Sequence, residues 1–146
     1  MSSVSIQAVS RIFEGHKGQR TQALLPVDFE VRDNDFVTIL GPSGCGKSTL
    51  LRIVAGLDHA TSGRVLLDGV PVEGPGADRG MVFQSYTLFP WLTIEQNIRF
   101  GLRERGMPEA QQKERAAYFI AKVGLRGFEQ HFPKQLSGGM QQRTAI

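Results

Sequence analysis

The sequence predicts an α/β fold, and three neighbouring features predict it. Residues 36–40 form a short apolar run of the strand type. A glycine-rich stretch follows at 41–46. Beyond it, apolar side chains recur at helical spacing, at Leu50, Leu51, Ile53, Val54 and Leu57. We therefore expect a strand that leads through a glycine loop into a helix, and that helix should end near Gly56.

The glycine-rich stretch fits G-x-x-x-x-G-K-[ST], the pattern of a phosphate-binding loop. It reads Gly41-Pro42-Ser43-Gly44-Cys45-Gly46-Lys47-Ser48-Thr49. Glycines let successive N–H groups turn toward one anion, and the helix directs its positive end at the same point. Lys47 would bring a positive charge to the β- and γ-phosphates, and Ser48 would offer a hydroxyl to Mg²⁺. A glycine-rich turn with a lysine in it is the alternative, and the expected strand and helix disfavour it.

The composition limits the possible partners and compartments. With 146 residues, 40% of them hydrophobic, the chain can bury one domain core. A net charge of +3 fits anionic partners or an ordinary mixed surface, and no block of like charges indicates nucleic-acid binding. Cys45 is the single cysteine, which fits a reducing compartment. The N-terminus has no secretory pattern and Arg52 interrupts the best apolar run, so we expect a soluble, cytoplasmic chain.

Two alternating segments before the loop predict half-buried strands. They lie at 4–9 and 23–31, and the second places Leu25, Val27, Phe29 and Val31 on one face. The polar, glycine-bearing stretch 11–22 between them is expected to be a loop or a hairpin connection. Asp33-Asn34-Asp35 predicts a turn.

A hairpin is predicted behind the loop helix. Asp68-Gly69 lies between the apolar runs 63–67 and 70–72, and an Asp-Gly pair in that position is a strong hairpin signal. Residues 74–79 form a Gly/Pro linker. The run 80–83 then indicates a short buried strand that ends at Gln84.

Helical signals dominate the rest of the chain. Thr93-Ile94-Glu95-Gln96 is a capping-box sequence that predicts the start of a helix. Pro108 suits a first helical position, and Gly124 closes the second predicted helix. Between them the apolar residues Ala116, Ile120 and Val123 form a stripe.

Two further segments complete a recognisable series of motifs. Gln84 follows the expected strand, and the segment Leu136-Ser137-Gly138-Gly139-Met140-Gln141-Gln142-Arg143 comes later. With the phosphate loop, they resemble the nucleotide-binding subunit of ABC transporters over essentially the whole chain. Gly74–Gln84 and 89–93 further resemble the nitrate, sulfonate and taurine importers of bacteria.

The resemblance implies a P-loop NTPase fold of the ABC type. This fold has a mixed core sheet, an antiparallel β edge subdomain and a helical subdomain. Residues 1–84 would supply the antiparallel strands and the loop core as far as Gln84. Residues 85–146 would supply the helical subdomain and the signature segment.

The same resemblance implies ATP and Mg²⁺ as cofactors. Lys47 and Gln84 would take part in catalysis, and Ser48 and Gln84 would contact Mg²⁺. The residues of Gly41–Thr49 would bind the nucleotide. Phe13 lies where the family carries an aromatic residue that stacks on adenine, although a core residue is the alternative. A surface glutamine is the alternative for Gln84.

The signature segment implies a second copy of the subunit. In the family, Ser137, Gly138 and Gly139 of one subunit cap the ATP on the loop of another, head to tail. An ordinary helix cap is the alternative. Met140 departs from the commoner Leu-Ser-Gly-Gly-Gln, and it removes a polar side chain from a position where a capping box would have one.

The resemblance also implies a membrane partner. The apolar segment Tyr86–Leu92 would line the groove that receives a helix of the transmembrane permease subunits, or would simply pack the helical subdomain. The subunit would then lie on the cytoplasmic face of the cell inner membrane. No nucleic acid is expected as a partner.

The motifs that follow the signature in the family cannot be assigned in this sequence. They are a strand ending in a Mg²⁺-associated Asp, a catalytic Glu and a switch His. We therefore expect no appreciable ATP hydrolysis by this chain alone, and marginal stability. Two other readings remain: an ABC ATPase of the DNA-repair type, which the lack of a heptad run between loop and signature disfavours, and a nucleotide-binding fragment without catalysis.

Overall fold

The computed structural model describes residues 2–146, apart from the side chain of Lys17. Two compact units follow one another along the chain, residues 1–81 and 82–146. The sequence-based division after Gln84 lies three residues further on and stays a prediction. In chain order the elements are β1 (Val4–Glu14), the 3-10 helix η1 (His16–Gly18), β2 (Arg20–Val31), α1 (Lys47–Val54), β3 (Ser62–Leu67), β4 (Val70–Pro71), α2 (Ile94–Glu104), α3 (Glu109–Lys122), the 3-10 helix η2 (Pro133–Gln135) and α4 (Gly138–Ala145).

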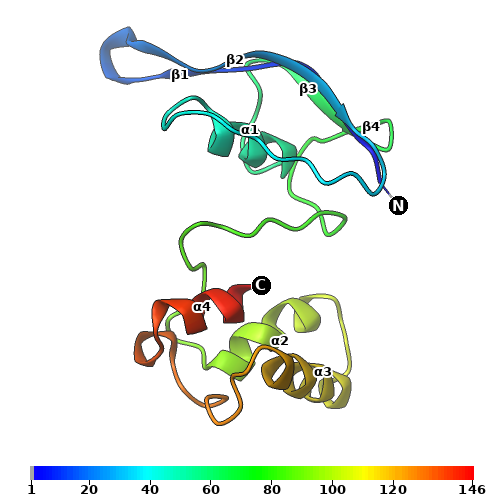
Figure 1. Cartoon of the computed structure of the whole chain (residues 1–146), viewed down its shortest axis with the longest axis vertical. Helices are drawn as coiled ribbons and strands as arrows, with labels where there is room; N and C mark the ends of the chain where they lie inside the picture. Colours follow the sequence, from blue (N-terminus) through cyan, green and yellow to red (C-terminus); the bar gives the residue numbers. More distant parts are fainter. Residues whose placement is uncertain (1) are drawn as a thin grey trace. The chain divides into compact units, whose positions relative to one another are not determined.

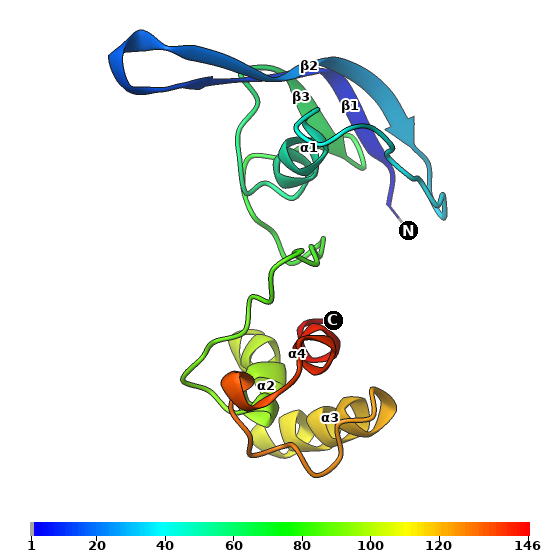
Figure 2. The ribbon, with the colours of Figure 1, turned by 60° about the vertical axis from the view of Figure 1, so that its left-hand side comes forward.

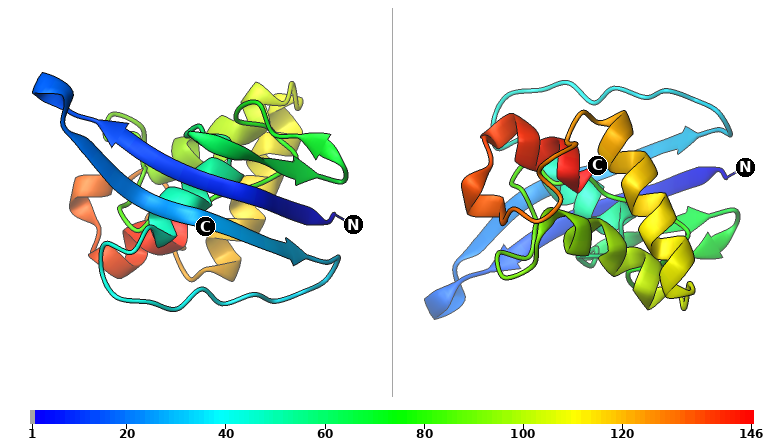
Figure 3. Two further views of the ribbon diagram at one scale, coloured as in Figure 1. Left: turned by 90° about the horizontal axis from the view of Figure 1, so that it is seen from above. Right: turned by 90° about the horizontal axis from the view of Figure 1, so that it is seen from below.

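The first unit contains an antiparallel sheet with the strand order β2-β1-β3-β4 (Figure 1). Seen from above, β1 and β2 run side by side as a long hairpin (Figure 3). The predicted hairpin at Asp68-Gly69 is confirmed, since both residues have positive φ and Leu67 pairs with Val70.

A bulge in β1 changes which side chains face the core. Ala8 has a φ of 47°, and its amide donates to the Asp28 carboxylate at 2.6 Å. The pairing of β1 with both neighbours is irregular here, so Ile6 and Val9 are both buried although three positions apart. Gly63 of β3 lies against the backbone of Ala8, where a Cβ has no room.

Helix α1 packs on one face of the sheet (Figure 2). The buried residues of this core are Ile6, Val9, Leu24, Leu50, Ile53 and Val65. The end of the helix is as expected: Gly56 has a φ of +73°, and the Leu57 amide donates to the Arg52 carbonyl at 2.8 Å.

Two strand predictions in this unit need correction. The stretch 11–22 is mostly strand, because Ile12 pairs with Gln22 and Glu14 with Arg20, and only residues 15–19 connect β1 to β2. The face predicted for β2 is wrong at Leu25, which is 70% exposed while Leu24 is buried. The pairing register shifts between Val9 and Arg11, opposite this point, and the shift breaks the alternation.

Neither 36–40 nor 80–83 forms a strand, so these two predictions are wrong for this structure. Phe36 and Leu40 are 95% and 88% exposed, and Val82 is 56% exposed. A strand needs a hydrogen-bonded neighbour, and within residues 2–146 no segment pairs with either run. The predicted turn before 36–40 is present, because the Asp35 amide donates to the Arg32 carbonyl at 3.1 Å.

The second unit packs α2, α3 and α4 around an apolar core (Figure 2). Its buried members are Ile94, Ala116, Ile120, Leu125 and Leu136. The predicted capping box is confirmed: the Gln96 amide donates to Thr93 Oγ1 at 3.3 Å, and the Thr93 amide to Gln96 Oε1 at 2.9 Å. Pro108 is the N-cap of α3 rather than its first residue, and Gly124 closes that helix with a φ of +70°.

The start of α2 is tied to the segment that precedes α4. The amides of Ile94 and Glu95 donate to the carbonyls of His131 and Glu129, at 2.9 and 3.0 Å. The Gln130 side chain adds a bond to the Glu95 carboxylate at 3.1 Å. These bonds satisfy helix-terminal N–H groups with backbone from another segment.

No helix within residues 2–146 has the length and apolarity needed to cross a lipid bilayer.

Candidate functional site

The glycine loop is shaped by two residues with positive φ. Gly44 has a φ of 82° and Gly46 a φ of 96°. Gly46 is also buried, and a Cβ at this position would lie 2.5 Å from the Ala23 carbonyl oxygen and 2.9 Å from Leu24 Cδ1. Glycine is therefore required at Gly46 twice, by the backbone conformation and by the close approach of β2.

Lys47 holds its charge over the loop. Its ammonium group donates to the carbonyl oxygens of Gly41 at 2.8 Å and Pro42 at 2.6 Å. Phosphate oxygens are stronger acceptors than these carbonyls, because they are charged. The ammonium group is therefore placed to exchange loop carbonyls for an anion bound in the loop.

The start of α1 leaves its first N–H groups available. Gly46 is the N-cap and supplies no side-chain cap, and the Leu50 amide makes the first helical bond, to the Gly46 carbonyl at 2.8 Å. Ser48, in the first turn, is exposed. Consecutive residues thus present the Lys47 ammonium group, the uncapped amides of α1 and the exposed Ser48 hydroxyl. The ammonium group and the amides suit an anion, and the hydroxyl suits a cation bound to that anion.

Cys45 faces the inside of the same loop. Its Sγ lies 3.5 Å from Lys47 Nζ, and a Cβ on Gly41 would come within 2.8 Å of it. The thiol is exposed, so it is open to modification.

Phe13 lies near the tip of the β1–β2 hairpin and is outside the buried core. It pairs with Thr21, is 41% exposed and carries the Arg11 guanidinium 4.5 Å from its ring centroid. Arg11 is held by Asp58 at 2.8 Å. Phe13 and Arg11 line a cavity of about 580 Å³, which Thr61 and Arg20 also border. The core-residue alternative for Phe13 is therefore wrong, and an aromatic face beside an open cavity remains.

The signature segment caps α4 as expected. Ser137 is the N-cap, and its Oγ accepts from the Met140 amide at 3.4 Å. Gly139 is exposed, and a Cβ there would meet nothing within 4 Å. Met140 packs against the apolar core of the second unit, which accounts for an apolar side chain at this position.

Gln84 is exposed and lies in the second unit with the signature segment, whereas the loop and Phe13 lie in the first. Beyond Gln84, an aromatic group surrounds Trp91, which is 69% exposed. The ring of Phe89 lies 5.5 Å from that of Trp91 and 4.5 Å from that of Phe100, measured between centroids.

Asn97 fixes the loop that carries Phe89 and Trp91, called here the aromatic loop. The sequence did not lead us to predict this role of Asn97. Its side chain accepts from the Phe89 amide at 2.8 Å and donates to the carbonyls of Phe89, Leu92 and Thr93, at 3.2, 3.0 and 2.9 Å. A polar residue four positions after the capping Thr93 was the available signal. Because one amide group makes four bonds, the shape of the loop depends on it.

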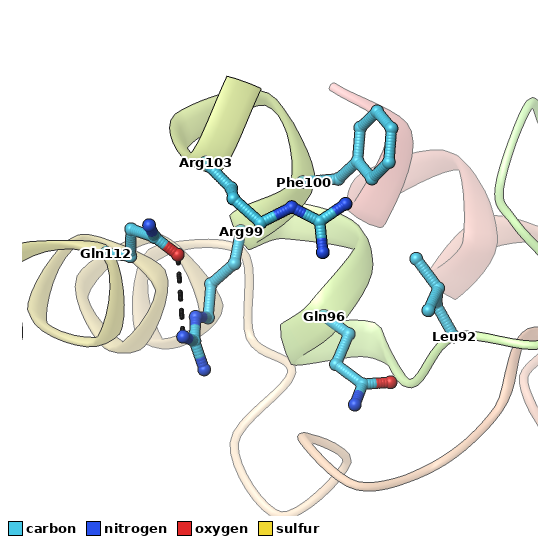
Figure 4. A pocket seen from close by; sticks show the side chains of 6 residues that line it. All are labelled: Leu92, Gln96, Arg99, Phe100, Arg103 and Gln112. Atoms are coloured by element: carbon cyan, nitrogen blue, oxygen red, sulfur yellow. Dashed lines mark hydrogen bonds between the residues drawn. The ribbon is translucent and has the colours of Figure 1, made fainter. Parts of the chain in front are cut away.

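A cavity of about 190 Å³ lies beside the same loop (Figure 4). Its lining combines apolar and basic side chains: Leu92, Gln96, Arg99, Phe100, Arg103 and Gln112. Arg99 is held by Gln112 at 3.4 Å and by the Glu95 carboxylate at 3.2 Å.

Comparisons with known proteins identify the family. The family model described as "ABC transporter" matches residues 24–146. An uncharacterized ABC transporter ATP-binding protein of Methanocaldococcus jannaschii is 56% identical over 98% of this chain and 53% of its own length. The nitrate import ATP-binding protein NrtD of Synechocystis is 48% identical over 98% of this chain and 53% of its own length. The taurine import ATP-binding protein TauB of Burkholderia pseudomallei is 47% identical over the whole chain and 56% of its own length.

Solved structures agree as well. The dimeric structure of an ATP-binding cassette in a post-hydrolysis state, bound to ADP and Pi, is 33% identical with a TM-score of 0.85. The match covers 97% of this chain and 66% of that one. The chain spans about half the length of the curated relatives it matches. The match over residues 24–146 and the glycine loop around Lys47 together place this chain in the ABC transporter family.

Proposed function

We propose that this chain is part of the ATP-binding subunit of a bacterial ABC importer, and that it binds Mg-ATP at Gly41–Thr49. The observation that carries the proposal is the loop itself: Gly46 cannot bear a side chain, and Lys47 Nζ lies over the carbonyls of Gly41 and Pro42. This arrangement suits the triphosphate of a nucleotide. Phe13, beside its open cavity, would stack on the adenine ring.

The residues around the loop also fit a magnesium ion that arrives with the nucleotide. Among residues 2–146 no group of three or more His, Cys, Asp or Glu residues could hold a metal by itself. Ser48 offers one exposed hydroxyl, so the phosphates would have to supply other ligands. The side chain of Gln84 would be a further ligand of the Mg²⁺ ion. Bound Mg²⁺ would neutralise charge on the phosphates during phosphoryl transfer.

A second copy of the subunit would complete each nucleotide site. Ser137, Gly138 and Gly139 would face the γ-phosphate on the loop of the partner subunit, in a head-to-tail dimer. Two observations support this: Gly139 is exposed and a Cβ there would meet nothing within 4 Å, and the similar cassettes form dimers in the solved structures.

The aromatic loop would connect the subunit to its permease. In the proposal, Tyr86–Leu92 contacts the transmembrane subunits, and the exposed Trp91 ring on a loop fixed by Asn97 supports this. The subunit would then lie on the cytoplasmic face of the inner membrane. Relatives named for nitrate, taurine and aliphatic sulfonate import favour a small oxyanion as the transported solute.

A mixing experiment with the full subunit tests the composite site. Lys47→Ala removes the loop charge, and Gly139→Asp places a carboxylate where the partner's γ-phosphate would lie, in a space that holds no other atom of this chain within 4 Å. Each variant alone should fail to dimerise with a non-hydrolysable Mg-ATP analogue. Mixed together under different tags, they should co-purify, because one of the two sites in the heterodimer is intact. Dimerisation of either variant alone, or no co-purification of the mixture, would refute the proposal.

A further inference from the structure

The segment that follows α1 holds the part of β1 that carries Phe13. The pairing of β1 with β3 ends at Ser10, opposite Ser62, and the β1–β2 hairpin extends past this point (Figure 1). There the Thr61 hydroxyl accepts from the Ile12 amide at 2.9 Å and donates to the Ile12 carbonyl at 3.3 Å. One side chain thus bonds to both backbone groups of the residue before Phe13.

A second contact from the same segment reaches the ring of Phe13. The Asp58 carboxylate lies 2.8 Å from a guanidinium nitrogen of Arg11, and these two side chains are only 17% and 23% exposed. The guanidinium carbon lies 4.5 Å from the centroid of the Phe13 ring, so the cation covers one face of the ring. Because the pair is mostly buried, it is held more firmly than an ion pair at the surface.

The same segment is joined to the phosphate loop through α1. The helix begins at Lys47 and ends in the turn at Gly56, where the Leu57 amide donates to the Arg52 carbonyl at 2.8 Å. Asp58 follows directly. A continuous series of bonded groups therefore leads from the phosphate loop to the Phe13 ring within one compact unit.

We propose that Arg11 and Asp58 are positioning residues for the nucleotide base. They hold one face of the Phe13 ring, so that its other face is presented to the base of a nucleotide whose phosphates lie in the loop. This inference rests on the proposed function, in which Phe13 stacks on adenine. A ring that is fixed before the nucleotide arrives strengthens binding, because less side-chain freedom is lost when the base stacks.

Binding of Mg-ATP and of Mg-tripolyphosphate to the full subunit tests the proposal. Tripolyphosphate offers the phosphates without a base. Phe13→Ala should weaken Mg-ATP binding by about tenfold or more, and Arg11→Ala by about three- to tenfold. Both variants should bind Mg-tripolyphosphate within about 1.5-fold of the wild type, because the phosphate loop is unchanged. A variant that merely destabilised the fold would lose affinity for both ligands alike.

A double-mutant cycle assigns the effect of Arg11 to the ring. In a Phe13→Ala background, Arg11→Ala should cause no further loss of Mg-ATP affinity. Arg11→Lys keeps the charge but not the planar group that stacks on the ring, so its affinity should lie between those of the wild type and Arg11→Ala. Asp58→Asn, which removes the charge that holds the guanidinium, should also weaken Mg-ATP binding selectively.

Arg64→Ala is the matched control. Arg64 also donates to a side chain of β1, that of Gln7 at 2.8 Å, but it is not among the residues that line the cavity beside Phe13. Its substitution should leave the affinities for both ligands unchanged.

The two proposals fail in different ways. If Phe13→Ala leaves Mg-ATP affinity unchanged, the stacking of Phe13 on adenine is wrong, and the role of Arg11 falls with it. If Phe13→Ala weakens Mg-ATP binding but Arg11→Ala does not, or Arg11→Ala weakens Mg-tripolyphosphate binding equally, the positioning role is overturned alone. Tighter Mg-ATP binding by Arg11→Ala would also overturn it, because the guanidinium would then occupy the face that the base needs.

Discussion

Substituting Gly46 by alanine tests the geometry of the loop more directly than any other change. The substitution forces a residue with a Cβ to adopt a φ of 96° and brings that Cβ to 2.5 Å from the Ala23 carbonyl oxygen. Gly44→Ala is the matched control, because Gly44 has a similar φ of 82° but no atom within 4 Å of the added Cβ. Both variants share the conformational cost, and only one adds the collision.

The expected magnitudes follow from these distances. A left-handed conformation costs a residue with a Cβ about 1–2 kcal/mol. The collision at Gly46 involves backbone of β2, which cannot swing aside as a side chain can, and overpacking of this kind costs about 1–3 kcal/mol. The free energy of unfolding should therefore fall by about 2–5 kcal/mol for Gly46→Ala and by about 1–2 kcal/mol for Gly44→Ala.

Urea unfolding followed by circular dichroism measures the difference. At an m value of about 2 kcal/mol/M, the two variants should differ in midpoint by roughly 0.5–1.5 M. Mg-ATP binding by both variants provides a second readout, and Gly46→Ala should bind more weakly because β2 or the loop must move. Equal midpoints and equal affinities for the two variants would show that β2 does not press on Gly46, and would refute the reasoning.

Four further outcomes are expected. The Ser3 amide donates to the Asp68 carboxylate at 2.7 Å and lowers the pKa of Asp68 below its ordinary 3.8. The bond therefore stabilises the native state above pH 3.8, and this stabilisation is lost as the pH falls through the lowered pKa. Asp68→Asn keeps an acceptor oxygen, so it should remove this part of the acid sensitivity when unfolding is followed as a function of pH. Alkylation of Cys45 should block nucleotide binding by bulk, since the thiol lies 3.5 Å from Lys47 Nζ, and unchanged affinity after complete modification, verified by mass spectrometry, would contradict this. Residues 1–146 alone should show no appreciable ATP hydrolysis, and a rate near that of a full subunit that disappears with Lys47→Ala would contradict it. Asn97→Ala should lower the free energy of unfolding of the second unit by about 1–3 kcal/mol and make the amide of Phe89 exchange faster with solvent. Asn97→Asp keeps only the acceptor, so its stability and exchange rate should lie between those of the wild type and Asn97→Ala.

Local signals predicted the elements that depend on neighbouring residues. The capping box at Thr93, the hairpin at Asp68-Gly69 and the glycine that ends α1 are all present, because each is stabilised by bonds within a few residues. The phosphate loop was predicted for the same reason: its pattern is contiguous. The resemblance to a family then supplied the fold class, which the comparisons confirm.

Predictions failed where the outcome depends on distant partners. Residues 36–40 and 80–83 carry strand-type side chains, but a strand is made by its neighbour, and none lies beside them within residues 2–146. The exposed side of β2 was mistaken at Leu25 because the pairing passes from Val9–Val27 to Arg11–Leu24, which leaves an extra residue in β2 and breaks the alternation there. Asn97 owes its importance to contacts that only the folded chain reveals.

The amides at the start of α2 donate to the carbonyls of Glu129 and His131, and this anchor limits where the later part of the chain can change in length. Upstream of this anchor the chain bends at Gly124 and Gly127, whose φ values are 70° and 88°, so we expect a change in length to be absorbed there if Leu125 keeps its place in the core. Downstream, we expect the number of residues from His131 to Ser137 to be constant, because an extra residue there would turn Gly138 and Gly139 away from their present direction. Related sequences should therefore vary in length before Glu129 and keep the same number of residues between His131 and Ser137.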